Sequence, residues 1–437
     1  MPEVGIQTDG GNGGARRRSV LDVMEIGDGF GSFGIGPEVT TQADMLSDKM
    51  DLFSTTPVEG YMEHFRESRI YPIAGQNNLG PWGFHVPAMA SLFLDASSMR
   101  LEGEVSIWER KSDGTEAMLT QDTNIIPINM LPVALFNNVE VSFNGLMVSF
   151  VSSPISNYKA YLETILSYNE LSARTHLAGS RFKIDDVGKF GATTTSAKTN
   201  QEARLKWFAK SNAADFSIPL ASDILRMDRY LMDRIALDIK LSRTNDQFLI
   251  TQDKDDAKNY FVKVDKLVLV VRHIGLKQSY VEHVNKQLDS GKRARYPLVR
   301  TVLKSRVIAT GESYTPIVDI FSGRMPSSIY FGFVKNSAFK GHKNENAFNF
   351  QSFDIGGVSL LVNSKCFPAQ RYTPSFTDDV STSKIMREYM GLMNNIGIQG
   401  GNESPLVTLE RFHEGCTIFG FDLRFVYYMI LIIHYIF

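Results

Sequence analysis

One stretch, residues 133–168, constrains the fold more than any other part of the chain. On both sides of Asn144-Gly145, apolar side chains alternate with polar neighbours, at Val139, Val141, Phe143, Leu146, Val148 and Phe150. Asn and Gly both tolerate the positive φ angles that a two-residue type I′ turn requires. The pattern therefore predicts a β-hairpin with one apolar face, as in a half-buried antiparallel sheet.

The apolar period changes after this hairpin. The spacing i, i+3, i+4, i+7, i+8 is occupied by Tyr158, Tyr161, Leu162, Ile165 and Leu166. This spacing places the five side chains in one stripe of an amphipathic helix. Pro154 is expected to end the preceding strand, and either Ser156 or Asn157 could cap the helix.

Composition indicates a globular protein with more than one core. A chain of 437 residues is expected to form two domains with tails. The chain is 43% hydrophobic and 22% charged, and its formal net charge of −2 argues against a general nucleic-acid coat. Two cysteines, Cys366 and Cys416, are too few for a disulfide scaffold, so we expect buried thiols in an intracellular protein.

Residues 1–50 are predicted to be a flexible, Gly-rich arm without the apolar core of a signal peptide. Gly29, Gly31 and Gly34 spell a dinucleotide-binding pattern by chance, because neither a strand before them nor a helix after them is indicated. The triplet Arg16, Arg17 and Arg18 either contacts nucleic acid or an acidic partner, or belongs to a solvated tail.

Residues 51–275 are predicted to be the first β domain. Its strands are expected at 91–94, 100–109, 133–143, 146–151, 215–219, 234–242 and 260–272. The interval 178–213 is rich in Gly, Thr, Ser, Ala and Lys, and it is predicted to be a long surface loop.

Residues 276–297 are predicted to form a helix, at 276–290, and a basic linker that is either solvated or a nucleic-acid patch. A second β domain follows at 298–424, with strands expected at 298–308, 327–334, 354–362 and 416–423. A helix at 381–396 carries Ile385, Met386, Tyr389, Met390 and Met393 on one side, a pattern typical of packing.

The sequence indicates no enzyme, cofactor site or metal site. Its eight histidines are scattered and have no metal-ligand spacing. The carboxylate pairs Asp185-Asp186 and Asp378-Asp379 have no basic partner in phase. Two other functions stay open: a β-sandwich binding or adhesion module, and a hydrolase whose catalytic pair is assembled from distant strands.

Several segments, in order, resemble the major capsid protein of Polinton (Maverick) elements and related adintovirus-like viruses. The resemblance covers roughly residues 60–423. It is carried by Ile126–Gly145, Tyr158–Tyr168, Arg295–Arg300, Phe321–Pro326, Asn346–Gln351 and Phe419–Leu423.

The resemblance implies an all-β double jelly roll, with two jelly-roll β-sandwiches in one chain and short inserted helices. It further implies homotrimeric, pseudo-hexagonal capsomers that tile an icosahedral shell around double-stranded DNA, with penton or minor capsid proteins as partners. The chain would be made in the cytoplasm or nucleus of a host cell and reside in the virion. The loop 178–213 would form a tower or an inter-subunit contact, and no residue would be catalytic.

The tail 425–437 departs from the family pattern. It is a continuous apolar run, Phe425-Val-Tyr-Tyr-Met-Ile-Leu-Ile-Ile-His-Tyr-Ile-Phe437, of about 13 residues, too short to span a bilayer. The leading interpretation is a truncated gene product with an incomplete second jelly roll. A tail that contacts a partner or membrane, and a strand that completes the second sheet, are the alternatives.

Overall fold

The computed structural model describes most of the chain after its first 59 residues. The described ranges are 60–73, 78–120, 123–149, 155–188, 199–254, 256–309, 311, 314–318, 326–362, 365–398, 404–423 and 428–435. The predicted arm 1–50, with its arginine triplet, therefore lies outside the described residues. Residues 59–437 form one compact unit by their contacts.

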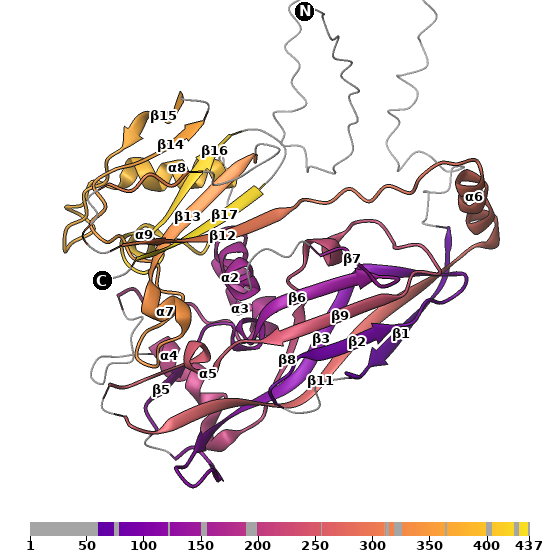
Figure 1. The fold of residues 1–437 in the computed structure, drawn as a ribbon, viewed down its shortest axis with the longest axis horizontal. Helices are drawn as coiled ribbons and strands as arrows, with labels where there is room; N and C mark the ends of the chain where they lie inside the picture. Colours follow the sequence, from indigo (N-terminus) through magenta and orange to yellow (C-terminus); the bar gives the residue numbers. More distant parts are fainter. Residues whose placement is uncertain are drawn as a thin grey trace, which may run out of the picture. The chain divides into compact units, whose positions relative to one another are not determined.

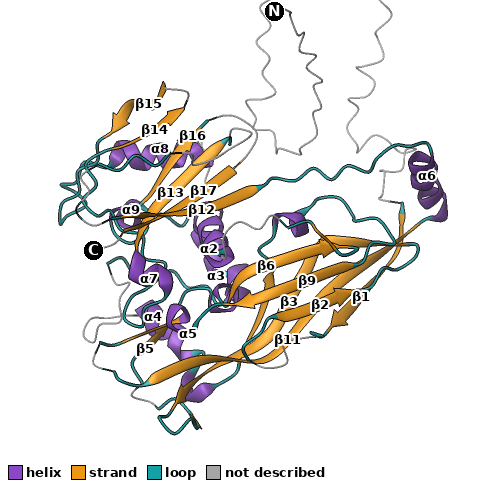
Figure 2. Cartoon of the chain, in the orientation of Figure 1, coloured by secondary structure: helices purple, strands orange, loops and turns teal. Residues whose placement is uncertain are grey.

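Strands dominate the described residues (Figures 1 and 2). In the first region they are β1 (Met62–Ile70), β2 (Trp82–Val86), β3 (Leu92–Arg110), β4 (Glu116–Ala117), β5 (Ile125–Pro127), β6 (Phe136–Phe143), β7 (Leu146–Met147), β8 (Ala214–Pro219), β9 (Leu237–Arg243), β10 (Ile250–Gln252) and β11 (Asn259–Leu276). Those of the second region are β12 (Thr301–Ile308), β13 (Ser328–Lys335), β14 (Val358–Val362), β15 (Lys365–Tyr372), β16 (Ile418–Asp422) and β17 (Tyr428–Tyr435).

The helices are mostly short and lie in the connections. They are α1 (Leu131–Ala134), α2 (Ser156–Ser167), α3 (Glu170–Arg174), α4 (Thr199–Lys206), α5 (Asp246–Leu249), α6 (Gln278–Asp289), α7 (Asn336–Lys340), α8 (Met386–Ile396) and α9 (Leu409–His413). The described residues also contain three 3-10 turns, η3 (His176–Ser180), η4 (Ala209–Ser211) and η5 (Asp223–Arg226).

The first region is a sandwich of two antiparallel sheets. One has the order β1-β11-β3-β8 and the other β2-β9-β6-β7, with β4 beside β3 and the pair β5–β10 apart. Numbered along the chain without β4, β5 and β10, the eight strands read 1-8-3-6 and 2-7-4-5. This interleaving of two four-stranded sheets is the strand order of a jelly roll.

Period-2 patterning explains why the two sheets face each other. Alternate residues of the strands point into one core, among them Leu101, Val105, Val141, Phe216, Leu237, Ile239, Leu241, Leu267 and Leu269, all buried. Residues between them, such as Glu102 and Lys240, face outward. Each sheet therefore has one apolar face, and the two faces bury each other.

The predicted turn is confirmed, but the strands around it are shorter than predicted. The first strand, β6, begins at Phe136 because residues 133–134 belong to α1, and β7 has two residues, both exposed. Asn144 and Gly145 have φ angles of 48° and 79°, and Ser142 pairs with Met147 across the turn. Two further hydrogen bonds hold the turn to Ala236. The backbone N–H of Asn144 donates to the Ala236 carbonyl, and the backbone N–H of Ala236 donates to the side-chain oxygen of Asn144. The predicted helix follows as α2. Its capping prediction was wrong: the N-cap residue is Ile155, with no side-chain cap.

The second region begins with a linker that runs along the first region. Arg229 donates to the carbonyl of Arg295 at 2.7 Å, and the backbone N–H of Met232 donates to the Tyr296 hydroxyl at 3.1 Å. The backbone N–H of Thr301 then donates to Asp223 at 2.8 Å, where β12 starts.

Among the described residues, the second region has one four-stranded sheet and one hairpin. The sheet order is β12-β17-β13-β16, and the hairpin is β14–β15. Strand β17 runs parallel to both of its neighbours. Of the alternatives for residues 425–437, the structure therefore contains the strand. The first region has the strand order of a jelly roll, whereas the described strands of the second region do not form that order.

Candidate functional site

The junction between the two β regions is built on α2. Its apolar stripe faces the segment Asn346–Gln351, whose Phe348 and Phe350 are buried. The Tyr161 ring stacks on Phe348 with centroids 4.1 Å apart, and Tyr158 meets Phe348 edge-on at 5.5 Å. Two of the segments that carry the sequence resemblance therefore pack against each other across the junction.

Tyr158 adds a directed contact to this aromatic packing. Its hydroxyl donates to the carbonyl of Ala347 at 2.8 Å, and its ring also stacks on Phe339 at 5.2 Å. Burial raises the pKa of Tyr158 well above its usual value, because the charged phenolate would lose its hydration. The hydroxyl therefore stays protonated and serves as a donor.

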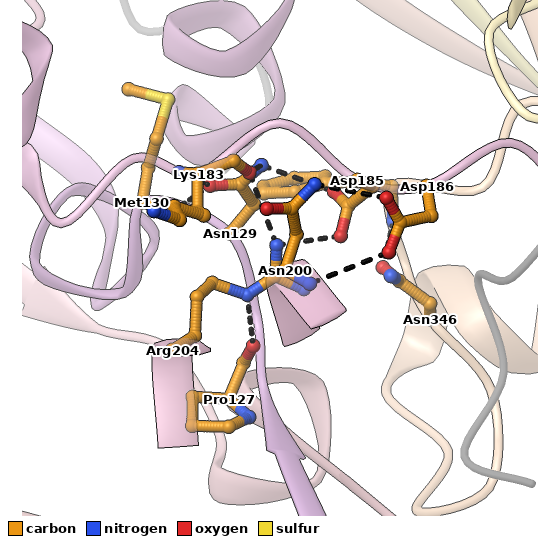
Figure 3. Close-up of polar contacts among 10 residues, drawn as sticks. Pro127, Asn129, Met130, Lys183, Asp185, Asp186, Asn200, Arg204 and Asn346 are labelled. Carbon is orange, nitrogen blue, oxygen red and sulfur yellow. Dashed lines mark hydrogen bonds and ion pairs between the residues drawn. The ribbon is translucent and has the colours of Figure 1, made fainter. Parts of the chain in front are cut away.

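A buried polar cluster lies beside the junction (Figure 3). The guanidinium of Arg204, in α4, is 1% exposed and lies 2.6 Å from the Asp185 carboxylate. Arg204 also donates to the carbonyls of Pro127, at 3.1 Å, and Lys183, at 3.2 Å. The side-chain amide of Asn129 donates to Asp185 at 3.0 Å and to the Lys183 carbonyl at 2.5 Å.

This cluster corrects two sequence expectations. Asp185 was expected to lack a basic partner, but Arg204 supplies one. The interval 178–213 was expected to be a surface loop, yet its α4 sits against β5 through Arg204, and Asn200 binds Asp186. The sequence hides this pairing because the two charges are 19 positions apart, on either side of a stretch that lies outside the described residues.

The space beside the cluster is small. A small cavity of about 10 Å³ lies beside it, lined by Asn129, Tyr161, Ile165, Phe182, Ile184, Asp185, Leu406, Arg411 and Cys416. Such a space holds about one water molecule. Burial, together with the nearby Asp185 carboxylate, raises the pKa of the Cys416 thiol to about 12, so this sulfur is not a nucleophile at neutral pH.

A wider groove of about 560 Å³ crosses the outer face of the sheet β1-β11-β3-β8. Its charged side chains lie in pairs: Arg69 with Glu102 at 2.6 Å, Lys266 with Glu104 at 3.7 Å, and Arg181 with Asp215. The three cations and three carboxylates of the groove neutralise one another in pairs, so the groove favours neither anionic nor cationic ligands.

Two kinds of feature are absent from the described ranges: a cluster of metal-ligating side chains and a helix that could span a membrane. Within those ranges, no group of three His, Cys, Asp or Glu side chains is placed to hold a metal ion. None of the helices there is long and apolar enough to cross a membrane. Asp379, of the second carboxylate pair, accepts from the backbone N–H of Ser381 at 2.9 Å, an exposed turn contact.

Comparisons with known proteins give distant similarities. No protein family model matches the chain. An uncharacterised protein of Caenorhabditis elegans is 21% identical over 350 residues, which cover 79% of this chain and 80% of that protein. Among solved structures, the mavirus major capsid protein aligns with a TM-score of 0.35 and 13% identity, over 58% of this chain and 55% of its own.

Two further solved structures show similarity at the same level. A chain of the Sputnik virophage aligns with a TM-score of 0.36 and 10% identity, over 53% of this chain and 52% of that one. The Faustovirus major capsid protein aligns with a TM-score of 0.31 and 9% identity, over 54% and 58%. The chain thus matches a little over half the length of each of these solved chains.

Proposed function

We propose that the chain is a structural shell subunit, a major capsid protein of a Polinton-like element or a related double-stranded DNA virus. In this proposal the second β region belongs to a second jelly roll, and three copies form a pseudo-hexagonal capsomer. The chain acts by packing against its own copies and against penton or minor capsid proteins, and it performs no catalysis.

The observation that carries the proposal is the strand order of the first region. Its sheets read 1-8-3-6 and 2-7-4-5, which is the jelly-roll order. Jelly rolls occur in viral capsid proteins and in lectins, so the fold alone does not choose between a shell and a binding module. The sequence resemblance, carried by several segments in the same order, favours the shell protein. Two of these segments, Tyr158–Tyr168 and Asn346–Gln351, pack against each other at the junction of the two regions.

The assembled state follows from the same proposal. A ring of three copies has a heterologous interface that closes on itself. Such a capsomer would stand in the shell of a virion, and the triplet Arg16, Arg17 and Arg18 would contact packaged DNA on its inner side.

The test is the native mass of the expressed chain, measured by light scattering on a size-exclusion column. We expect three times the chain mass of 49.0 kDa, and particles of hexagonal outline by electron microscopy. A stable monomer at micromolar concentration would contradict the capsomer.

A binding module is the second candidate, and the groove over β1-β11-β3-β8 is the observation that favours it. Because its charges are already paired, we expect no saturable binding of simple sugars or short acidic peptides in calorimetry. A monomer that binds such a ligand, and loses it on Glu102→Ala, would replace the shell proposal with this one.

A further inference from the structure

The linker between α6 and β12 carries most of a surface that we call the basic patch, which consists of Arg229, Lys292, Arg293 and Arg295. All four residues are exposed, and the linker itself, drawn between α6 and β12 in Figure 1, contains neither helix nor strand. Arg229 comes from the connection between β8 and β9, and its guanidinium donates to the Arg295 carbonyl at 2.7 Å. Positive charges from two distant parts of the sequence therefore lie together.

The charges of the basic patch are not neutralised by the described residues. The ion pairs of the described ranges involve other cations, and Asp228 and Asp289, the acidic residues nearest to the patch in sequence, pair with none of the four. Lys292 donates to the side-chain oxygen of Gln287, and Arg229 donates to a backbone carbonyl, so both acceptors are uncharged. Neighbouring like charges repel each other, and such a surface gains from an anionic partner.

Hydrogen bonds hold the patch in place at both ends of the linker. The backbone N–H of Lys292 donates to the Gln287 carbonyl at 3.1 Å, which fixes the start of the linker to α6. The backbone N–H of Met232 donates to the Tyr296 hydroxyl at 3.1 Å, which fixes the linker to the first region just after Arg295. A surface that is ordered before binding loses little entropy when it binds.

Compensation of the α6 dipole does not explain the whole patch. The last carbonyls of a helix favour a nearby cation, but this effect falls off within the last turn. Helix α6 ends at Asp289, so the dipole accounts for Lys292 at most. It leaves Arg293, Arg295 and Arg229 without an explanation in the fold.

The residue types of the patch favour a phosphate backbone as the partner. Three of its four cations are arginines, whose planar guanidinium binds two phosphate oxygens at once. Residues 291–295, Gly-Lys-Arg-Ala-Arg, include no large apolar side chain that would enter a bilayer. Duplex DNA presents closely spaced phosphates and can neutralise several of these cations together.

We propose that the basic patch binds the sugar-phosphate backbone of double-stranded DNA without preference for sequence. Contacts to phosphate position a protein on a duplex but carry no sequence information. The inference goes beyond the proposed function, because it requires only one copy of the chain. In a shell of such chains, the patch would face the packaged DNA.

The experiment measures binding of a short fluorescent duplex to the full chain by anisotropy, over a range of salt concentrations. The linker variant combines Lys292→Gln, Arg293→Gln and Arg295→Gln, and it keeps the backbone carbonyl to which Arg229 donates. Each phosphate contact contributes about 0.9 to the slope of log affinity against log salt, so this slope should fall by about 2.7. Binding at low salt should weaken at least about tenfold, and equally for two unrelated sequences.

The matched control removes three exposed cations that are paired with carboxylates. It combines Arg69→Gln, Arg174→Gln and Lys266→Gln, whose partners are Glu102, Glu170 and Glu104. The net charge changes by the same amount as in the linker variant, but we expect the salt slope of the parent chain. The arginine triplet at residues 16–18 is present in every chain compared, so its contribution cancels. Thermal transitions of both variants should match that of the parent.

Several outcomes would overturn the inference. They are equal salt slopes for the parent and the linker variant, an equal loss in the control variant, and a parent chain that binds phosphatidylserine vesicles but not the duplex. The proposed function fails separately, through the native mass. A monomer that binds DNA through the linker would remove the capsomer and keep this inference, and a trimer that binds no DNA would do the reverse.

Discussion

The two β regions use similar sheet orders with different strand directions. In β1-β11-β3-β8 and in β12-β17-β13-β16, the first strand of the region pairs with its last strand, which then lies inside the sheet. Strand β11 is antiparallel to both neighbours, whereas β17 is parallel to both. The last strand of each region thus has the same place in its sheet but a different direction relative to its neighbours.

The two regions also differ in the number of strands that accompany their second sheet's hairpin. Hairpin β6–β7 has β9 and β2 beside it, and together they cover the first sheet. Hairpin β14–β15 has no third strand among the described residues of its sheet. The second region instead uses α8, which packs along β16, and the aromatic junction with α2. A region with fewer strands depends more on its neighbours for burial.

Deleting β17 is expected to have the largest effect on the second region relative to the first. A chain that ends at Leu423 opens the edges of β12 and β13, so we expect the amides of Ser328–Lys335 to lose protection in hydrogen exchange. The amides of β11 should keep their protection, because their partners β1 and β3 are intact. Equal protection of β13 with and without β17 would show that this strand contributes nothing to the second sheet.

Breaking the buried ion pair should have the next largest effect. Arg204→Ala leaves the Asp185 carboxylate buried without its cation, and we expect the free energy of unfolding to fall by about 3–5 kcal/mol. The control is Arg226→Ala, which removes a half-exposed partner of Glu163 and should change this free energy by less than about 1 kcal/mol. Urea titration followed by tryptophan fluorescence measures both, and equal losses would contradict a special role for Arg204.

A smaller effect is expected at the hairpin turn. Gly145→Ala meets no atom within 4 Å, but the φ of 79° strains any residue with a Cβ. The free energy of unfolding should fall by about 1 kcal/mol. Gly356→Ala, in the second region, also meets open space, without a positive φ. It should leave stability unchanged or raise it slightly, and thermal denaturation distinguishes the two results.

The smallest effect concerns the thiols. Native protein at pH 8 should react with iodoacetamide at half-buried Cys366 and not at buried Cys416, whose pKa is raised to about 12. Because the folded-state pKa is the higher one, the stability that Cys416 contributes is present below the unfolded-state pKa of about 9. It is lost as the pH rises towards 12. Equal labelling of both thiols, read by peptide mass spectrometry, would refute the burial of Cys416.

Local patterns in the sequence predicted much of the first region. Alternation predicted β9, a near-continuous apolar run predicted β11, Asn144-Gly145 predicted the turn, and the helical stripe predicted α2. Strand β1 was missed because Glu63–Glu67 are exposed on both faces, as at a sheet edge, so no alternation is present. Met386 and Met390 were expected to pack, but they face solvent, because Ile385 and Leu392 occupy the buried side of α8. Met393, on the same stripe as these two methionines, is buried as expected.

The candidate site was harder to predict, because its contacts join distant parts of the sequence. The pairing of Asp185 with Arg204, and of Tyr161 with Phe348, depends on how the chain returns to the same place. Periodicity reports which face of an element is buried, but it does not report what covers that face. Tyr161 and Phe348 were each recognised within a resembling segment, but their contact required the structure.

The continuous core across the junction has a mechanical consequence. Side chains of both regions belong to one buried cluster, with Tyr158, Tyr161, Phe348 and Phe350 in contact at the boundary. Close-packed side chains resist compression and shear, so the two regions should respond to force as one stiff body and not as halves on a hinge. In any assembly of these chains, bending would then be concentrated at the contacts between copies, where curvature is set.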